Sequence, residues 1–379
     1  MPHVSLRTVL REWLRLGAIG FGGPPAHIAL LRTLTITKYQ WMDEAEFEHA
    51  VATTGLLPGP ASTQMAIYCA WRVRGVAGAL VGGVSFILPG LVMIVALSAA
   101  FFQHHPDVFI LGAAMGAGAV VPAVALSTAV GMITPSFRST AGDRARRWRW
   151  LAYVGLGTAC AIWATPYVVL TLITCGLAEI TARRVGSRGS LAVLGASGAH
   201  ALVLGGSGAL AWVAFKVGAL SYGGGFVIIP LMQHDVVSVY HWMTGTQFLN
   251  AVALGQVTPG PVVLTTAAVG YAACGVWGAL LATLVAFGPS FAFVIGGAGS
   301  FERVRANTTA QSFLAGAGPS VIGAIAGSSV PLAAALVHLW QIPLLIAGAT
   351  WLLWRKSSTV YPLLAAALIG AALAHVVPV

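Results

Sequence analysis

The chain has 379 residues, of which 58% are hydrophobic and only 8% are charged. A soluble domain carries about 25% charged residues, so this chain lacks the polar surface that a soluble globule of its size requires. Its net charge of +10 comes from short basic clusters between apolar runs, which excludes a single nucleic-acid-binding patch and is typical of cytoplasmic membrane loops.

Several uncharged apolar runs are long enough to cross a bilayer. A helix needs about 20 residues to cross a hydrocarbon core of about 30 Å, and backbone groups in lipid must be bonded within the segment. The runs lie at 75–102, 108–137, 151–178, 190–215 and 270–300. The sequence therefore predicts an all-α integral membrane protein with roughly 10–13 membrane segments.

The first apolar stretch is interrupted at 21–25, which reads Phe-Gly-Gly-Pro-Pro. Proline removes a backbone donor and glycine permits a turn, so a helix should end here and a new one should begin with free N–H groups. A second break follows at 57–64, where Pro60 suits a first helical turn. Such backbone is tolerated at membrane depth only where protein or a water-filled cavity lines it, which predicts broken or re-entrant helices.

Both breaks recur later in the chain. At an offset of 201 residues, 16 of the 44 positions from Gly17 to Pro60 are identical, including the Pro-Gly-Pro at 58–60 and 259–261. The sequence divides into a first repeat at 1–136, a middle block with a basic loop and about three membrane segments at 137–207, a second repeat at 208–338 and a C-terminal membrane hairpin at 339–379.

The basic clusters predict the topology of the repeats. The richest, 138–149, is expected in the cytoplasm, and counting spans from it places Arg72 and Arg74 on the same side. The matching residues 272–274 carry no charge and fall on the opposite side. The repeats should therefore be inverted, an arrangement typical of secondary transporters with a site at the repeat interface. The N-terminus is predicted inside and the C-terminus outside.

The residues at the breaks are the candidate substrate-binding site. Helix N-termini carry partial positive charge and unpaired N–H donors, so they bind anions. Hydroxyl, amide and imidazole side chains nearby add donors. The breaks and these neighbours comprise Gly22, Gly23, His27, Pro58, Gly59, Pro60, Ser62, Thr63, Gln64, Gly223, Gly224, Gln256, Pro259, Gly260 and Pro261, with Thr258, Thr265 and Thr266 close by. The alternative is that the breaks only kink helices and let them pack closely.

Two cations and two proton-relay candidates complete the predicted site. Lys216 lies alone in an apolar segment, and its repeat partner is Arg15, so the pair could converge on one anion. Snorkelling to the interface is the alternative for Lys216, and an interfacial amphipathic helix is the alternative for Arg15. Glu48 and His49 reach into an apolar run and are candidates for proton coupling.

The motifs at 21–28 and 57–64, together with the order of the two repeats, resemble the signature of the chromate ion transporter family in its long-chain, two-repeat form. The second repeat departs from this pattern, with Gly225 in place of the first proline and Ile228 in place of the histidine. The resemblance implies export of chromate, or handling of the similar dianion sulfate, coupled to an ion gradient.

The sequence thus predicts a secondary transporter that exports chromate or a related tetrahedral oxyanion across the cytoplasmic membrane. Alternatives are a sulfate or other oxyanion transporter, an anion channel of the same architecture, a membrane enzyme, and a cation or neutral-solute carrier. No catalytic, nucleotide-binding or metal-ligand motif is found, so no enzyme activity, cofactor or metal is expected. The expected partners are the dianion, the bilayer and a coupling ion; a homodimer is compatible with the sequence, and nucleic acid is not expected.

Overall fold

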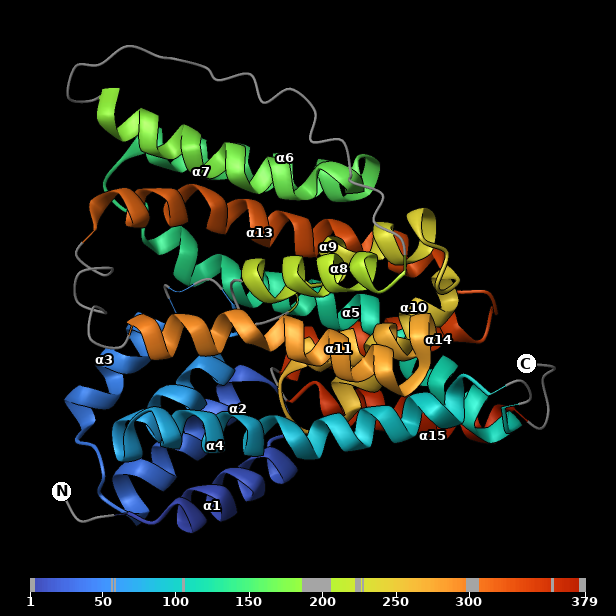
Figure 1. Cartoon of the computed structure of the whole chain (residues 1–379). Coiled ribbons are helices and arrows are strands. Elements are labelled where there is room, and N and C mark those ends of the chain that lie inside the picture. The colour runs from blue at the N-terminus through green and yellow to red at the C-terminus, as the bar shows by residue number, and fades with distance from the viewer. Residues whose placement is uncertain are drawn as a thin grey trace.

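The protein is described by a computed structural model that covers residues 4–55, 57, 59–103, 106–185, 206–221, 226, 228–297, 307–355 and 358–374. Throughout these ranges the regular structure is helical, without a strand (Figure 1). Within the described ranges, five helices are long and apolar enough to cross a membrane. The prediction of an all-α membrane protein is confirmed.

The first repeat begins with short helices and ends with two long ones. Side chains fix several starts: Ser5 accepts a hydrogen bond from the Thr8 N–H at 3.1 Å, and Asp43 accepts one from the Glu46 N–H at 2.7 Å. In chain order the elements are α1 (Leu6–Ile19), α2 (Pro24–Arg32), the π-helix η1 (Thr33–Lys38), α3 (Glu44–Thr54), α4 (Ala61–Phe101) and α5 (Val108–Arg138).

The second repeat follows the same order. Its elements are α8 (Ser207–Leu220), α9 (Ile228–His234), the π-helix η3 (Asp235–Val239), α10 (Gly245–Val257), the 3-10 helix η4 (Val262–Leu264), α11 (Thr265–Gly297) and α13 (Thr308–Ala334). Thr244 and Gln247 form a reciprocal capping box at the start of α10, where the first repeat uses Asp43.

The two repeats share unusual backbone geometry as well as element order. Gln40 and His241, at equivalent positions of the two repeats, both have positive φ, at 53° and 51°. The long helices α4 and α11 each have a sharp kink at a glycine with positive φ and at the residue before it. The glycines are Gly75, with φ of 60°, and Gly275, with φ of 63°. Positive φ is rare outside glycine, so its recurrence at matching positions shows that the duplication extends to local conformation.

The short helices cannot cross the bilayer singly. Among the short helices of the two repeats, α1 and α8 are the longest, with 14 residues each, and they span about 21 Å at 1.5 Å per residue. This is less than the hydrocarbon thickness of about 30 Å. Short helices on either side of a Gly/Pro break must therefore combine in order to span or re-enter the membrane, and the choice between the two stays a prediction.

Helices α4 and α11 pack against each other and run in opposite directions, as the colour gradient in Figure 1 shows. Repeat-related residues meet along this contact. One apolar groove is lined by Leu80, Val84, Ile87, Leu88 and Leu91 of α4 and by their counterparts in the second repeat, Leu280, Leu284, Phe287, Gly288 and Phe291 of α11. An inverted pair of repeats predicts this antiparallel pairing; the inverted membrane topology itself stays a prediction.

The remaining helices extend the bundle on both sides. In the middle block, α6 (Arg144–Trp163), the 3-10 helix η2 (Thr165–Tyr167) and α7 (Val168–Val185) follow one another, and α6 and α7 pack on α13. In the tail, α14 (Gln341–Arg355) and α15 (Val360–Leu373) pack on α5. The apolar run at 190–215 lies mainly outside the described residues.

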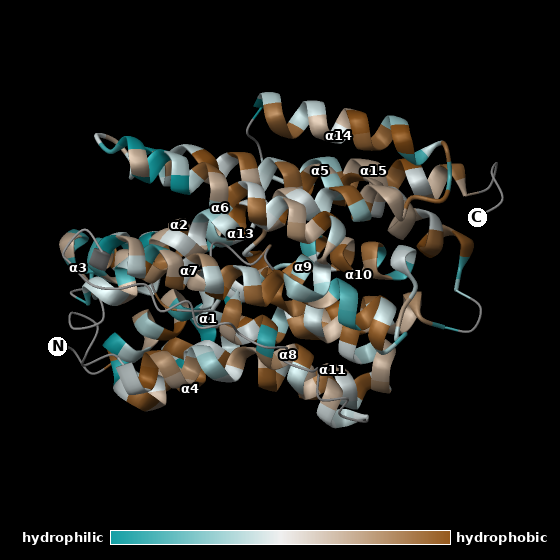
Figure 2. Ribbon diagram, turned by 90° about the horizontal axis from the view of Figure 1, so that it is seen from above, coloured by the Kyte–Doolittle hydropathy of each residue, from teal (hydrophilic) through white to brown (hydrophobic). Residues whose placement is uncertain are grey.

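Glycines let the outer helices touch backbone to backbone. A β-carbon at Gly116 of α5 would overlap the carbonyl oxygen of Ala366 on α15, and Gly370 of α15 meets Gly112 of α5 in the same way. Small residues at such contacts are the usual means of helix packing in lipid, where apolar surface gains nothing by leaving the hydrocarbon. The hydrophilic residues in Figure 2 gather at one end of the bundle, around α3 and the start of α6.

We expect Gly116→Ala to destabilise the fold, because the added methyl group meets backbone that cannot rotate away. Overpacking of this kind costs about 1–3 kcal/mol. The check is the thermal stability of the purified protein in detergent. The matched control is Gly131→Ala on the same helix, where nothing lies within 4 Å of the added β-carbon. Equal melting temperatures of the two variants would contradict the packing account.

Candidate functional site

The first break holds its shape through two glycines and a buried histidine. Gly22 and Gly23 have φ of 101° and 73°, a region that suits glycine, and α2 begins at Pro24. The His27 ring lies 2.8 Å from the Gly20 carbonyl oxygen through Nε2, and packs edge-on to Phe86 with ring centroids 5.1 Å apart. Its Nδ1 is buried without a partner among the described residues. His27 therefore closes this break, with one ring nitrogen left without a partner in the described part of the chain.

The second break presents the start of α4. Gly59 has φ of 118°, and Pro60 is the N-cap of the helix. The Thr63 and Gln64 N–H groups donate to the Pro60 carbonyl at 3.0 Å each. The N–H groups of Ala61 and Ser62 lie in the first turn, ahead of the helical hydrogen-bond ladder. Ser62, Thr63 and Gln64 are all buried, so this helix start faces protein rather than lipid. Pro58 lies outside the described residues.

The breaks of the second repeat are partly described. Gly223 and Gly224 lie outside the described residues, between the end of α8 at Leu220 and the start of α9 at Ile228. At the fourth break, Gly260 has φ of 99°, and Pro261 is the N-cap of η4, which leads into α11. Gln256 and Thr258 beside it are buried.

The breaks of the two repeats contact each other directly. The Gly260 N–H donates to the Gly20 carbonyl at 2.9 Å, which joins the fourth break to the first. A β-carbon on Gly59 would lie 3.2 Å from the Gly218 carbonyl oxygen and 3.2 Å from Ser290 Oγ, so the second break lies against α8 and α11. The described contacts thus bring breaks from different repeats together, although they are far apart in the sequence.

Each long helix holds the break of the opposite repeat at an equivalent position. Gly90 of α4 leaves no room for a side chain against the Pro259 carbonyl, and its counterpart Ser290 of α11 faces Gly59. The repeats therefore interlock around one central region. The same arrangement puts a glycine on one side of that region and a hydroxyl on the other.

Two serines in this region are not among the residues predicted from the sequence. Ser221 and Ser290 are fully buried, and their hydroxyls have no hydrogen-bond partner in the described part of the chain. Thr63 Oγ1 and Gln256 Nε2 are also buried without a hydrogen-bond partner in the described part of the chain. Buried polar atoms are nearly always bonded, so each of these unpaired atoms is available to a polar ligand or a water molecule. The sequence does contain a signal for both serines, because they replace Gly20 and Gly90 of the first repeat.

Lys216 is not an isolated cation. It forms an ion pair with Asp235 of η3, and both side chains are largely buried, at 14% and 18% exposure. The pair joins α8 to the π-helix of the second repeat. The first repeat makes the same connection with the signs exchanged: Glu12 of α1 accepts from Lys38 of η1 at 2.9 Å. Asp235 was not predicted as the partner because a helix break separates it from Lys216 in the sequence.

The other predicted site residues that can carry charge, apart from His27, are exposed. Arg15 is exposed on α1. Glu48 and His49 are exposed on α3, and Glu48 is 3.4 Å from Arg32. The described residues contain no group of three metal-ligating side chains, and Cys69, Cys160 and Cys175 are buried thiols. The chemistry that this arrangement supports is binding by neutral donors, with charge supplied at a distance.

A duplicated helical membrane fold with helix breaks that meet between the repeats defines a membrane transporter. The profile of the chromate transporter family matches residues 7–180 and 208–371, and the chain belongs to this family. No solved structure matches the chain.

Relatives of similar length support this assignment. The chromate transport protein of Cupriavidus metallidurans is 30% identical, over 97% of this chain and 93% of the relative. The probable chromate transport protein of Synechococcus elongatus is 28% identical, over 94% and 92%. The chromate transport protein of Pseudomonas aeruginosa is 29% identical, over 97% and 92%.

We expect Lys216→Gln to destabilise the protein, because it leaves Asp235 without its counter-charge. The loss should lie near 1–3 kcal/mol, between the values for exposed and fully buried pairs. The double variant Lys216→Glu, Asp235→Lys should recover most of the stability, since the first repeat uses that polarity. Thermal unfolding of the three proteins is the measurement. A double variant no more stable than Lys216→Gln would show that the pair does not join the two helices.

Proposed function

We propose that this protein carries chromate, or a closely related tetrahedral oxyanion, outward across the cytoplasmic membrane. The anion binds where the breaks of the two repeats meet. Two observations carry the proposal. Thr63, Ser221 and Ser290 have buried hydroxyls without protein partners in the described part of the chain, and a hydrogen bond joins the breaks at Gly260 and Gly20. Membership of the chromate transporter family supports the substrate class.

The chemistry of the substrate fits these donors. Chromate and sulfate present only acceptor oxygens when fully ionised, so a site for them must consist of donors. The start of α4 supplies the N–H groups of Ala61 and Ser62 together with the partial positive charge of a helix N-terminus. Hydroxyls can rotate to donate, and the Gln256 amide adds two further N–H groups. Such a site binds a dianion without a resident cation.

The ion pair of Lys216 suggests an indirect role for that residue. Because its charge is compensated by Asp235, the lysine positions α8 rather than holding the anion alone. Arg15 is exposed and acts at most as a surface charge that attracts anions. The neutral site has a functional advantage, because an anion bound by dipoles leaves more readily than one paired with a buried cation.

Outward transport is the direction that the membrane potential favours for an anion. The membrane potential is negative inside, so it drives anions outward, by about 2.3 kcal/mol per charge at 100 mV. Inverted repeats offer two equivalent pathways to one central site, and movement of one repeat against the other opens them in turn. Glu48 and His49 of α3 remain the candidates for coupling to protons, and Glu48 lies 3.4 Å from Arg32 of α2.

The proposed topology has the N-terminus inside and the C-terminus outside. Arg138, Arg144, Arg146 and Arg147 lie around the turn between α5 and α6, whereas the turn between α13 and α14, at His338, has no lysine or arginine. This asymmetry favours the cytoplasm for the α5–α6 turn.

The direct test is flux of radiolabelled chromate and sulfate in proteoliposomes that contain the purified protein. We expect saturable uptake of chromate, inhibited by sulfate. Absence of flux for both ions would refute the substrate class. Flux that does not saturate and that carries a unitary current would instead identify an anion channel.

We expect Ser290→Ala to raise the KM for the anion by roughly 10- to 100-fold, because a hydrogen bond to a charged group contributes about 1.5–3 kcal/mol. The matched control is Ser85→Ala. Ser85 is equally buried on α4, but its hydroxyl already donates to the Val81 carbonyl at 2.5 Å. Transport in both variants is measured at matched protein content. An unchanged KM in Ser290→Ala would remove this serine from the site.

A further inference from the structure

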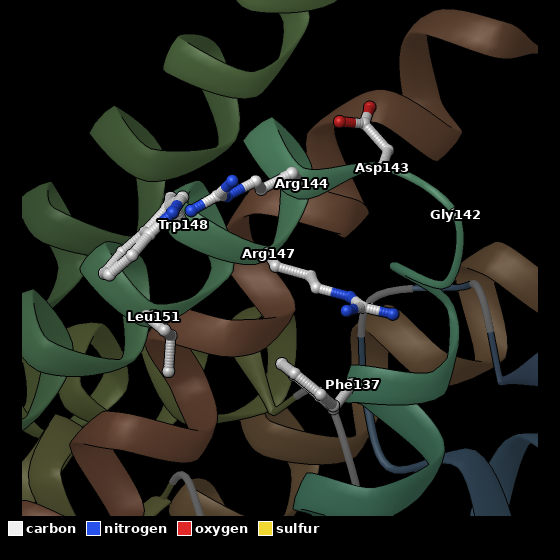
Figure 3. Close-up of a pocket in the computed structure, with 7 residues that line it drawn as sticks. All are labelled: Phe137, Gly142, Asp143, Arg144, Arg147, Trp148 and Leu151. Carbon is white, nitrogen blue, oxygen red and sulfur yellow. The ribbon is translucent and has the colours of Figure 1, made fainter.

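A second pocket lies far along the chain from the contacts between the breaks, at the turn that joins α5 to α6. It has a volume of about 440 Å³ and is lined by Phe137, Gly142, Asp143, Arg144, Arg147, Trp148 and Leu151 (Figure 3). Figure 3 shows Arg147 extended above Phe137 and Arg144 directed toward Trp148.

The upper part of this pocket carries uncompensated positive charge. Neither Arg144 nor Arg147 has an ion-pair partner among the described residues, and both are exposed. Arg149, on the same helix, is satisfied by Glu179 at 2.8 Å. Asp143 is the one acid in the lining, but its carboxylate is directed to the start of α6, where it accepts from the Arg146 N–H at 3.1 Å. The pocket therefore presents two guanidinium groups to an incoming ligand.

The backbone at the helix start also holds the pKa of the Asp143 carboxyl below its usual range, because the Arg146 N–H donates to it. This carboxylate stays charged at neutral pH and keeps the turn in place. It reduces the net positive charge of the pocket from two to one, so an incoming anion must lie against the guanidinium side rather than beside Asp143.

The lower part of the pocket is apolar, and packing contacts and a hydrogen bond hold it in place. Phe137 packs edge-on to Trp150 with centroids 5.1 Å apart, and the Trp150 Nε1–H donates to Ser136 Oγ at 2.9 Å. These contacts fix the end of α5 to α6. The Arg147 guanidinium lies 6.0 Å from the Phe137 ring, within cation–π range. Leu151 and Trp148 continue the apolar side, and both are exposed.

The position along the helices places this pocket at the edge of the bilayer. α5 is long and apolar enough to span the membrane, and it ends at Arg138. The apolar part of α6 begins near Leu151, one turn beyond Arg147. Tryptophan at this level is typical of the membrane–water interface. A ligand here would meet arginines on the aqueous side and hydrocarbon on the other.

We propose that this pocket binds an anionic phospholipid, whose phosphate lies against Arg144 and Arg147 and whose first acyl methylenes lie on Phe137 and Leu151. Arginine pairs well with phosphate because its planar donors match two oxygens. Basic pockets next to membrane helices on the cytoplasmic side attract such head groups. A free phosphate ion uses the same arginines but gains nothing from the apolar side, which is why the lipid is favoured.

The experiment uses the full-length protein in detergent and native mass spectrometry, with phosphatidylglycerol and phosphatidylcholine of identical acyl chains added in turn. We expect wild type to bind phosphatidylglycerol more tightly. Arg144→Gln and Arg147→Gln should each lower that affinity about fivefold and leave phosphatidylcholine binding unchanged. The matched control is Arg138→Gln, which removes one charge from the same basic region but does not line the pocket.

Three outcomes would overturn the proposal. Equal loss in Arg138→Gln and in the pocket variants would show attraction to net charge rather than a site. Competition by millimolar inorganic phosphate, with equal affinity for the two lipids, would show a site for soluble anions. Unchanged phosphatidylglycerol binding in the double variant Arg144→Gln, Arg147→Gln, shown by its melting temperature to be folded, would place the lipid elsewhere.

Discussion

The fold depends on how broken helices are satisfied inside a membrane. Each break frees backbone N–H and C=O groups, and lipid offers them no partner. The hydrogen bond from the Gly260 N–H to the Gly20 carbonyl satisfies one group of each break, because the break of one repeat supplies the donor and the break of the other supplies the acceptor. Contact between the two repeats thus satisfies backbone groups that lipid could not.

The two repeats are not identical. The first repeat holds its break with His27 and has glycine at positions 20 and 90, where the second repeat has Ser221 and Ser290. The ion pairs that join the first helix of each repeat to its π-helix have opposite polarity, Glu12 with Lys38 and Lys216 with Asp235. A common backbone thus carries two sets of side chains, and the central region is polar on one side and closely packed on the other.

The order of the helices, the breaks and the duplication were predictable from the sequence, whereas contacts between distant segments were not. Element order, breaks and duplication follow from local chemistry, since glycine, proline and apolar length act within a few residues. The pairing of Lys216 with Asp235, and the approach of Ser290 to Gly59, join segments separated by a turn or by a whole repeat. Such contacts depend on how helices cross in space, which periodicity does not encode. Comparing the repeats position by position would have identified the two serines.

The close contacts are distributed unevenly over the molecule. The outer helices meet backbone to backbone, Gly116 and Gly370 on one side and Gly157 against Ser320 on the other, and such packing resists sliding because any shift produces overlap. Between the repeats, α4 and α11 instead enclose an apolar groove of about 440 Å³, and the central hydroxyls have no partner in the described part of the chain. The interface between the repeats is therefore held at the breaks, by contacts such as Gly90 against the Pro259 carbonyl, and is less closely packed along this groove.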